Sequence, residues 1–403
     1  MIYQSERLPA LRGASVRLDA KVDESGVWQQ RLLDEKSLIV LDLFCGAGGL
    51  SLGFQNAGFF TAAGVDADPW AAMSHGHNLL SRSVVRDISS IDDPALFMRE
   101  LGVPRVDVIV GGPPCQGFAR VGRGKLRSIE REAYYSEVLN NLYREFVRFV
   151  DVLKPAAFVM ENVPDMARYD GGKLLEKIKG SFPGYVVDHR ILDAALYGVP
   201  QRRKRLFVQG NRLGLKVVWP EPTVAQRFVT VKDAISDLPV RTPPSLEEVL
   251  PYRPESQTEY QVLMRKDVLP EHRDVVFDHI IRQVREDDKI IFNLLPQGGK
   301  YRDLPEYLQR YRTDIFDDRY WRLINDQPAW TVTAHICKDA YRYIHPDQCR
   351  TLSIREFARL QSFPDHFRFA GPRTERLRQI GNAVPPLLAE HIAASLYQQL
   401  TAE

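Results

Sequence analysis

Short continuous runs of apolar residues, separated by helix-like segments, dominate the chain from about residue 38 onward. Runs of this length, bounded by glycine and proline, are typical of strands that are buried on both faces of a sheet. Five such strands are predicted, at residues 38–44, 60–65, 106–110, 157–160 and 206–208. Because strands that alternate with helices favour parallel pairing, the pattern predicts an α/β fold with a doubly wound, mostly parallel sheet.

The pattern changes between residues 211 and 328, where proline is frequent and periodicity is irregular. We interpret this stretch as a second, smaller domain or a long insertion. Helical periodicity returns in residues 353–361 and again after Pro385 and Pro386. The predicted organisation is an N-terminal extension without an assigned role (1–37), a main domain (38–210), the smaller domain (211–328) and a return to the main domain (329–403).

The composition excludes some classes of protein but does not by itself identify the function. A formal net charge of +2 does not identify a nucleic-acid binder, so any basic surface must be local. The chain has no run as long as a membrane span and begins without the apolar core of a signal peptide, which predicts a cytoplasmic protein with no membrane partner. Its four cysteines form no CxxC pair, so neither a disulfide framework nor a metal site is expected.

One thiol, Cys115, follows a predicted buried strand through the sequence Gly111-Gly112-Pro113-Pro114. Ligands bind at the carboxyl ends of strands in open α/β sheets, glycines let a substrate approach the backbone, and two prolines hold a loop extended. This placement indicates a nucleophile. A small, buried apolar side chain is the alternative for any isolated cysteine.

A basic segment that contains glycines follows this thiol. Between residues 118 and 132 it carries Arg120, Arg123, Lys125, Arg127 and Arg131. Next to a nucleophile, such a segment indicates a mobile lid that closes over a phosphate backbone. A solvated surface loop would have the same composition.

A glycine turn, Gly46-Ala47-Gly48-Gly49, follows the first predicted strand and could bring backbone amides and a helix N-terminus to a ligand. A dinucleotide fingerprint would need glycine at position 51, where this chain has Ser51. Asp66, at the end of the next strand, can accept hydrogen bonds from ribose hydroxyls. Asp87 can accept from an adenine amino group or be an ordinary loop carboxylate.

Two further segments place charged residues at strand ends. Glu161 follows the strand at 157–160, where a carboxylate needs either a structural ion pair or a role in proton transfer. The sequence QRRKR at 201–205 leads into the last strand, and a period of two puts Gln201, Arg203 and Arg205 on one face. A solvated strand start or a basic targeting tetrapeptide would give the same residues.

Six segments, in order, resemble the DNA (cytosine-5)-methyltransferase family. They are DLFCGAGGLSLGF at 42–54, GGPPCQGF at 111–118, ENVP at 161–164, QRRKR at 201–205, RTLSIREFARLQSFP at 350–364 and QIGNAVPP at 379–386. The resemblance covers nearly the whole chain from residue 38, apart from 211–328, which it assigns to target recognition. It implies the fold of S-adenosylmethionine-dependent methyltransferases and a role in a bacterial restriction-modification system.

The resemblance also implies a mechanism. A thiolate at Cys115 would add to position 6 of a flipped-out cytosine, and position 5 would then accept the methyl group of S-adenosylmethionine. Glu161 would share a proton with ring atom N3. Arg203 and Arg205 would hold the base oxygen and help to keep the thiolate ionised.

The remaining site residues are implied in the same way. Those expected at the cofactor are Asp42, Phe44, Gly46, Gly48, Asp66, Asp87, Asn382 and Val384. Those expected at the nucleic-acid substrate are Pro113, Gln116, Arg120, Arg123, Asn162 and Thr331. For Thr331, which lies in the sequence Trp-Thr-Val-Thr, an ordinary β-strand threonine is the alternative.

The implied partner is double-stranded DNA, and the enzyme is expected to act as a monomer. A restriction endonuclease is expected to be linked to it functionally, without necessarily binding to it. A transfer RNA cytosine methyltransferase would use the same chemistry, but the long insertion at 211–328 favours duplex DNA. A catalytically silent DNA-binding regulator is the alternative from another class, and the intact Cys115 and Glu161 argue against it. A nicotinamide oxidoreductase is disfavoured by Ser51 and by the thiol loop. The recognition sequence cannot be read from 211–328.

Overall fold

The computed structural model describes residues 16–17, 26–114, 142–224, 227–242, 247–310 and 319–402, and the chain divides into two units. Unit 1 comprises Met1–Asp193, Lys204–Pro222 and Pro386–Glu403, and unit 2 comprises Ala194–Arg203 and Thr223–Pro385. The functional division predicted from the sequence uses other boundaries, and it stays a prediction.

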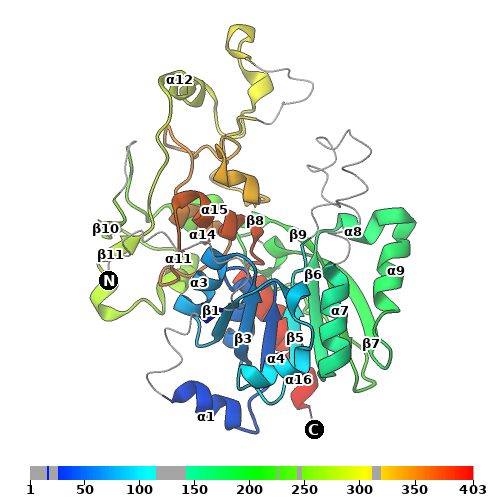
Figure 1. Ribbon diagram of the computed structural model, residues 1–403. Helices are drawn as coiled ribbons and strands as arrows, with labels where there is room; N and C mark the ends of the chain where they lie inside the picture. The colour runs from blue at the N-terminus through cyan, green and yellow to red at the C-terminus, as the bar shows by residue number, and fades with distance from the viewer. Residues whose placement is uncertain are drawn as a thin grey trace. The chain divides into compact units, whose positions relative to one another are not determined.

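Unit 1 is built on an eight-stranded sheet (Figure 1). In spatial order its strands are β1 (Val16–Arg17), β4 (Arg82–Val85), β3 (Phe60–Asp66), β2 (Ile39–Leu43), β5 (Val108–Gly111), β6 (Ala157–Asn162), β9 (Lys204–Asn211) and β7 (Val186–Asp193). The strands from β4 to β6 run parallel, whereas β9 is antiparallel to both of its neighbours and β1 is antiparallel to β4. The predicted α/β fold with a mostly parallel sheet is confirmed, and all five predicted strands are present.

Three strands of this sheet were not predicted: β1, which is two residues long, and the strands β4 and β7. β4 is only four residues long, and β7 has most of its side chains partly or fully exposed. Neither strand therefore has the continuous apolar run by which the buried strands were found. In contrast, β2 is buried at every position.

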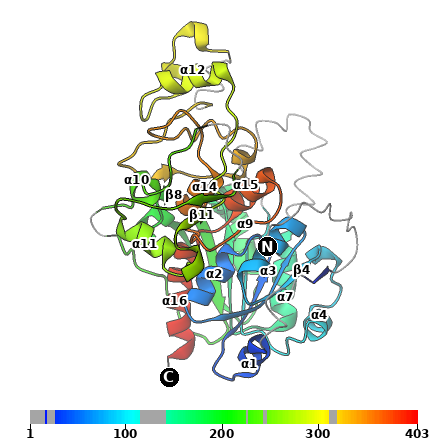
Figure 2. The same ribbon diagram turned by 90° about the vertical axis from the view of Figure 1, so that its left-hand side faces the viewer.

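Helices cover both faces of the sheet. α2 (Gly49–Asn56) packs against α16 (Pro386–Thr401) on one face, and α4 (Pro94–Glu100) and α7 (Leu142–Leu153) lie together on the other (Figures 1 and 2). The other helices in the described part of unit 1 are α1 (Val27–Leu33), α3 (Pro69–Asn78), η1 (Ile88–Ser90), α8 (Asp165–Arg168), η2 (Tyr169–Gly172) and α9 (Lys173–Lys179). The approach of α2 to α16 requires Gly53, because a Cβ at this position would lie 2.4 Å from the Cβ of Ala389.

Unit 2 is irregular, as its frequent prolines predicted. It contains two small sheets, in which β8 (Gln201–Arg202) pairs with β12 (Ala329–Trp330) and β10 (Val249–Pro251) pairs with β11 (Val275–Phe277). Its helices are η3 (Ala194–Tyr197), α10 (Val231–Ile235), α11 (Glu259–Arg265), η4 (Pro270–His272), α12 (Glu286–Leu294), η5 (Tyr301–Asp303), η6 (Glu306–Leu308), η7 (Ala334–Cys337), α14 (Ile354–Leu360) and α15 (Arg373–Asn382).

Buried ion pairs around α14 hold much of unit 2 together. Arg350, Arg355 and Arg359 have no exposed surface, although arginine is rarely buried. Each faces a carboxylate within unit 2: Arg350 contacts Glu356 at 2.7 Å, Arg355 contacts Asp278 at 3.3 Å, and Arg359 contacts Asp237 at 2.5 Å and Asp365 at 2.8 Å. These arginines therefore organise the interior of unit 2, and solvent does not reach them.

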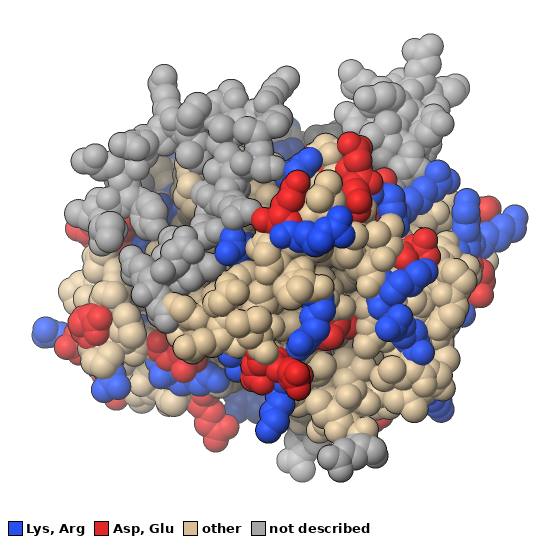
Figure 3. Space-filling view, turned by 60° about the horizontal axis from the view of Figure 1, so that its bottom comes forward, with Lys and Arg blue, Asp and Glu red and all other residues tan. Residues whose placement is uncertain are grey.

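Charges of both signs are mixed on the face of the protein that Figure 3 shows, in keeping with the small net charge. Within the described part of the chain, no helix is both long enough and apolar enough to cross a membrane.

Candidate active site

The glycine turn after β2 has an unusual backbone. Phe44 has a φ of 59°, which is rare for a bulky side chain and costs about 1 to 3 kcal/mol. Gly46 and Gly48 also have positive φ values, of 55° and 100°, and α2 begins at the next residue, Gly49. A Cβ at Gly48 would lie 2.7 Å from Leu79, so both conformation and space require glycine there. The turn thus leads directly into a helix N-terminus, as the sequence predicted.

Asp66 fixes this turn from the end of β3. Its Oδ2 accepts a hydrogen bond from the Gly46 amide at 2.8 Å, and its Oδ1 accepts from the Asp68 amide, also at 2.8 Å. Burial raises the pKa of Asp66 to about 6, although these backbone donors favour the charged form. Asp66 as a residue is partly exposed, and its carboxylate oxygens have lone pairs left for a further donor, so its contact with a ribose stays a prediction.

A chain of four buried polar side chains begins at Asp42 in β2. The Ser51 hydroxyl donates to Asp42 Oδ2 at 2.6 Å, Nε2 of His75 lies 3.0 Å from Ser51 Oγ, and Nδ1 of His75 lies 2.6 Å from Ser83 Oγ. When Asp42 is ionised, Ser51 gives its one proton to Asp42, so Nε2 of His75 donates to Ser51 and Nδ1 accepts from Ser83. None of the four side chains has exposed surface.

The buried environment of these four hydrogen-bonded side chains shifts the pKa values of Asp42 and His75 in opposite directions. Burial raises the pKa of Asp42 to about 7 and lowers that of His75 to about 3. The Oδ1 atom of Asp42 has no hydrogen-bond partner among the described residues. Sequence reasoning missed His75 and Ser83 entirely and noted Ser51 only as the residue that breaks a glycine fingerprint.

The other residues expected at the cofactor lie in both units. Asp87 is exposed and caps η1, where it accepts from the Ser89 amide at 2.9 Å and from the Ser89 hydroxyl at 2.7 Å. Asn382 is the exposed last residue of α15 in unit 2, and Val384 follows it as a buried residue. Their contacts with a cofactor stay predictions.

The start of the thiol loop is held by residues from β6. The Asn162 side-chain amide donates to the Pro113 carbonyl at 3.1 Å, and a Cβ at Gly112 would lie only 3.0 Å from Glu161 Oε2. Gly111 ends β5 and leaves no room for a side chain, because a Cβ there would lie 2.3 Å from the Leu43 carbonyl oxygen. The loop therefore leaves the sheet in a fixed direction. Cys115, Gln116, Arg120 and Arg123 themselves lie outside the described residues.

Glu161 and Arg205 form an ion pair in unit 1. Glu161 Oε1 and Arg205 Nε are 2.9 Å apart, and their side chains are only 12% and 13% exposed. The pairing of β6 with β9 brings the two strands together. A carboxylate at this strand end thus has the ionic partner that its partial burial requires, while it keeps some contact with solvent.

The alternation predicted for QRRKR is present. Gln201 and Arg203 are buried, whereas Arg202 and Lys204 are exposed. The Arg203 guanidinium donates to the carbonyls of Val332, Gly381 and Ala383 at 2.5, 3.1 and 2.8 Å. Arg203 thus ties β8 to the end of α15 and to the segment after β12.

Thr331 belongs to the same part of unit 2. Its hydroxyl donates to the Arg202 carbonyl at 2.7 Å, and its own carbonyl accepts from the Tyr343 hydroxyl at 2.5 Å. A Cβ at Gly381 would lie 2.4 Å from the Thr333 carbonyl carbon, so α15 packs directly on this segment. Thr331 is partly exposed, and its contact with a nucleotide stays a prediction.

Comparisons with known proteins agree with these features. The model of the family of C-5 cytosine-specific DNA methylases matches residues 38–398. Type II methyltransferase M1.HphI of Haemophilus parahaemolyticus is 34% identical over 91% of this chain and 88% of its own length. Type II methyltransferase M.AgeI of Thalassovita gelatinovora is 32% identical over 88% of this chain and 98% of its own length.

Among solved structures, a protein assigned as a DNA modification methyltransferase encoded within an Escherichia coli prophage has a TM-score of 0.72 and 28% identity. The comparison covers 90% of this chain and 99% of that one. The Dnmt2 methyltransferase of S. pombe, with a TM-score of 0.51 and 15% identity, supports the fold alone.

The chain therefore belongs to the C-5 cytosine-specific DNA methylase family. It is a DNA (cytosine-5)-methyltransferase of the type found in restriction-modification systems, as the sequence predicted.

Proposed function

We propose that this enzyme transfers the methyl group of S-adenosylmethionine to carbon 5 of a flipped-out cytosine in duplex DNA, through a covalent bond between Cys115 and carbon 6. One observation carries the proposal. The end of β6 supplies both the Glu161 carboxylate, paired with Arg205 at 2.9 Å, and the Asn162 amide, which holds the Pro113 carbonyl two residues before Cys115. An acid group and the start of the nucleophile loop are thus fixed by two consecutive residues.

The glycine turn of unit 1 fits S-adenosylmethionine. Gly46 and Gly48 give the turn its shape, and α2 begins directly after it at Gly49, so a helix N-terminus lies at the end of the turn. The strained Phe44 offers a half-buried ring, and Asp66 keeps lone pairs for ribose hydroxyls. Asp42 is fully buried, so we propose that it acts on the cofactor site by positioning Ser51 at the start of α2. The bound cofactor supplies an electrophilic methyl group.

Cytosine carbon 5 is a poor nucleophile until a thiolate adds to carbon 6. In the proposed reaction Cys115 Sγ forms this bond while Glu161 gives a proton to N3, which compensates the charge that develops on the ring. After carbon 5 has been methylated, a water molecule takes the proton of carbon 5, the bond between sulfur and carbon 6 breaks with its electron pair on sulfur, and N3 returns its proton to Glu161. These steps restore the aromatic ring and the free thiolate. The base must leave the stacked duplex for the thiolate to reach its face.

The two arginines of QRRKR would have different roles. Arg205 is partly exposed and directly paired with Glu161, so it can hold Glu161 and contact the base. Arg203 is 1% exposed and donates to three backbone carbonyls, so we propose that it acts as a positioning residue for the segment around Thr331. We also expect a monomer that acts on bacterial DNA in the cytoplasm, alongside an endonuclease that cuts the same sequence.

The experiment is covalent trapping. The wild-type enzyme, incubated with S-adenosylmethionine and duplex DNA that contains 5-fluorocytosine, should form a complex that survives denaturation, because fluorine cannot leave carbon 5 as the proton does. Cys115→Ser should form no such complex and should not methylate DNA. Cys337→Ser, a change at a partly exposed thiol of unit 2, is the matched control and should keep both activities.

Bisulfite sequencing of DNA from cells that express the wild-type chain identifies the methylated cytosine and its sequence context. A complex formed by Cys115→Ser, or full methylation by it, would refute the proposed nucleophile. Methylation of transfer RNA but not of duplex DNA would refute the proposed substrate.

A further inference from the structure

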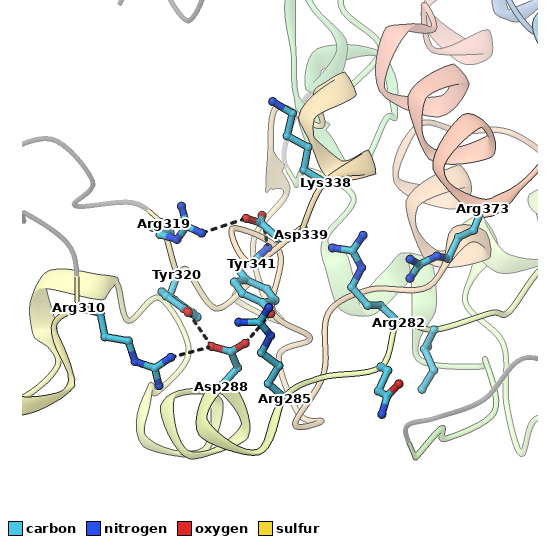
Figure 4. A pocket seen from close by; sticks show the side chains of 12 residues that line it. Arg282, Arg285, Asp288, Arg310, Arg319, Tyr320, Lys338, Asp339, Tyr341 and Arg373 are labelled. Atoms are coloured by element: carbon cyan, nitrogen blue, oxygen red, sulfur yellow. Dashed lines mark hydrogen bonds and ion pairs between the residues drawn. The ribbon is translucent and has the colours of Figure 1, made fainter. Parts of the chain in front are cut away.

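Unit 2 contains an open cavity of about 600 Å³ whose walls are strongly cationic (Figure 4). Six cationic and two acidic side chains line it. They come from segments that are far apart in the sequence: Arg282 and Arg285 precede α12, Lys338 follows η7, and Arg373 begins α15. This cluster is not visible in the sequence, and none of these residues belongs to the candidate active site.

The two carboxylates of the wall are already compensated by other residues. Asp288 accepts hydrogen bonds from the Tyr320 hydroxyl at 2.7 Å and the Tyr341 hydroxyl at 2.5 Å. Asp339 pairs with Arg319 at 3.5 Å, as Figure 4 also shows. Arg310 pairs with Asp287 at 2.5 Å and lies 3.9 Å from Asp288, so Arg310 and Arg319 are the two cations of the wall that have carboxylate partners among the described residues.

Four cations remain: Arg282, Arg285, Lys338 and Arg373 have no ion-pair partner among the described residues. Figure 4 shows the guanidinium group of Arg373 directed towards the side chain of Arg282. Partial burial, together with repulsion by the Arg282 charge, lowers the pKa of Arg373. Like charges brought together in a cavity without a counter-ion are stabilised when an anion binds between them.

The chemistry of the wall narrows the choice of anion. Arginine binds phosphate oxygens with two parallel N–H donors, and three of the four unpaired cations are arginines. Several cations on separate segments suit a ligand with several phosphates along a chain. For an enzyme that acts on DNA, this ligand is the phosphodiester backbone.

We infer that this cavity binds the phosphodiester backbone of the substrate DNA and so contributes affinity that does not depend on sequence. The inference rests on the proposal that duplex DNA is the substrate. Contacts to phosphates fix the position of a protein on DNA but carry no sequence information, whereas contacts to base edges do. The cavity is therefore expected to set how tightly DNA binds, and not which cytosine is methylated.

The test measures binding of a random-sequence DNA duplex over a range of salt concentrations. For Arg282→Gln/Lys338→Gln/Arg373→Gln, the log–log slope of affinity against salt should fall by about 0.9 for each phosphate contact that is lost. Arg285→Gln/Lys338→Gln changes only exposed side chains, so it tests the same point without risk to folding. The matched control is Arg253→Gln/Arg273→Gln/Arg302→Gln, which removes three exposed cations of unit 2 outside the cavity and should keep the wild-type slope.

Two further measurements make the result specific. Binding of S-adenosylmethionine should be unchanged in all variants, and bisulfite sequencing should give the wild-type methylation pattern at a lower rate. A wild-type slope in both cavity variants, or a changed methylation pattern, would overturn the inference. Tight binding of inorganic pyrophosphate that the cavity variants lose, with the DNA slope unchanged, would assign the cavity to a free phosphate compound instead.

The failure of the inference can be told apart from the failure of the proposed function. If the wild-type enzyme neither binds nor methylates DNA, the proposed function is wrong. If the wild-type enzyme does both and the cavity variants match it in salt slope, only the assignment of the cavity is wrong.

Discussion

Replacing Ser51 with alanine should destabilise unit 1 by an amount that increases with pH. The change removes one hydroxyl from a fully buried site and leaves two groups without partners: Asp42 Oδ2 and His75 Nε2. A hydrogen bond to a charged group contributes about 1.5 to 3 kcal/mol, and a buried donor without an acceptor costs about 1 to 3 kcal/mol. We therefore expect a loss of about 2.5 to 6 kcal/mol when Asp42 is ionised.

The pH dependence follows from the pKa of Asp42. Burial raises this pKa from 3.8 to about 7, so the folded protein binds the proton more tightly than the unfolded chain does. The stability that Asp42 contributes is therefore fully present below pH 3.8 and is lost as pH rises towards 7. The Ser51 hydrogen bond lowers the pKa of Asp42, so Ser51→Ala raises it further and extends the loss to higher pH.

Each unit of additional pKa shift costs about 1.4 kcal/mol, so the destabilisation by Ser51→Ala should be larger at about pH 8.5 than at about pH 6 by roughly that amount. The other titratable groups near Asp42 contribute equally to the stability of the wild type and of Ser51→Ala, so their contributions cancel in the comparison. His75, whose pKa is about 3, stays neutral in the folded protein, burial keeps the Cys45 thiol neutral by raising its pKa, and Asp66 is the same in both proteins.

The assay is denaturant unfolding at both pH values, combined with hydrogen exchange of the β2 and β3 amides, which reports on unit 1 alone. Ser83→Ala is the matched control, because it leaves Nδ1 of His75 without a donor but removes no hydrogen bond to a carboxylate. Its destabilisation should not change with pH. Equal destabilisation by Ser51→Ala at both pH values, or the same increase in Ser83→Ala, would refute this account of the buried chain.

Three further predictions test other parts of the structure. Gly53→Ala should destabilise the protein by about 1 to 3 kcal/mol in denaturant unfolding, because overlap with Ala389 outweighs a gain in helix propensity of about 1 kcal/mol, and a stabilised variant would contradict this packing. Asp66→Ala should weaken S-adenosylmethionine by about 1 to 3 kcal/mol in calorimetry, and unchanged affinity would exclude Asp66 from the cofactor site. Glu356→Gln should cost about 3 to 5 kcal/mol of stability, because it leaves Arg350 buried and unpaired, and a loss below about 1 kcal/mol would show that the pair is unimportant.

The sequence by itself determined the features that depend on neighbouring residues. Continuous apolar runs predicted the five buried strands, because a strand covered on both faces needs apolar side chains at every position. Glycines with a required backbone conformation marked the turn at Gly46 and Gly48. Helical periodicity over residues 353–361 predicted α14, which in the structure begins with a capping box formed by Ser353 and Glu356.

Only the tertiary structure decided which distant residues act together. Arg203 was predicted to contact the base. In the structure its guanidinium donates to the carbonyls of Val332 and Gly381, which lie more than a hundred residues further along the chain. His75 joins Asp42 through Ser51, and the cavity cations Arg282 and Arg373 come from segments with no local relation. The physical reason is that periodicity and turn chemistry describe interactions within a few residues, whereas burial of a polar side chain is tolerated only where the folded chain supplies its partners.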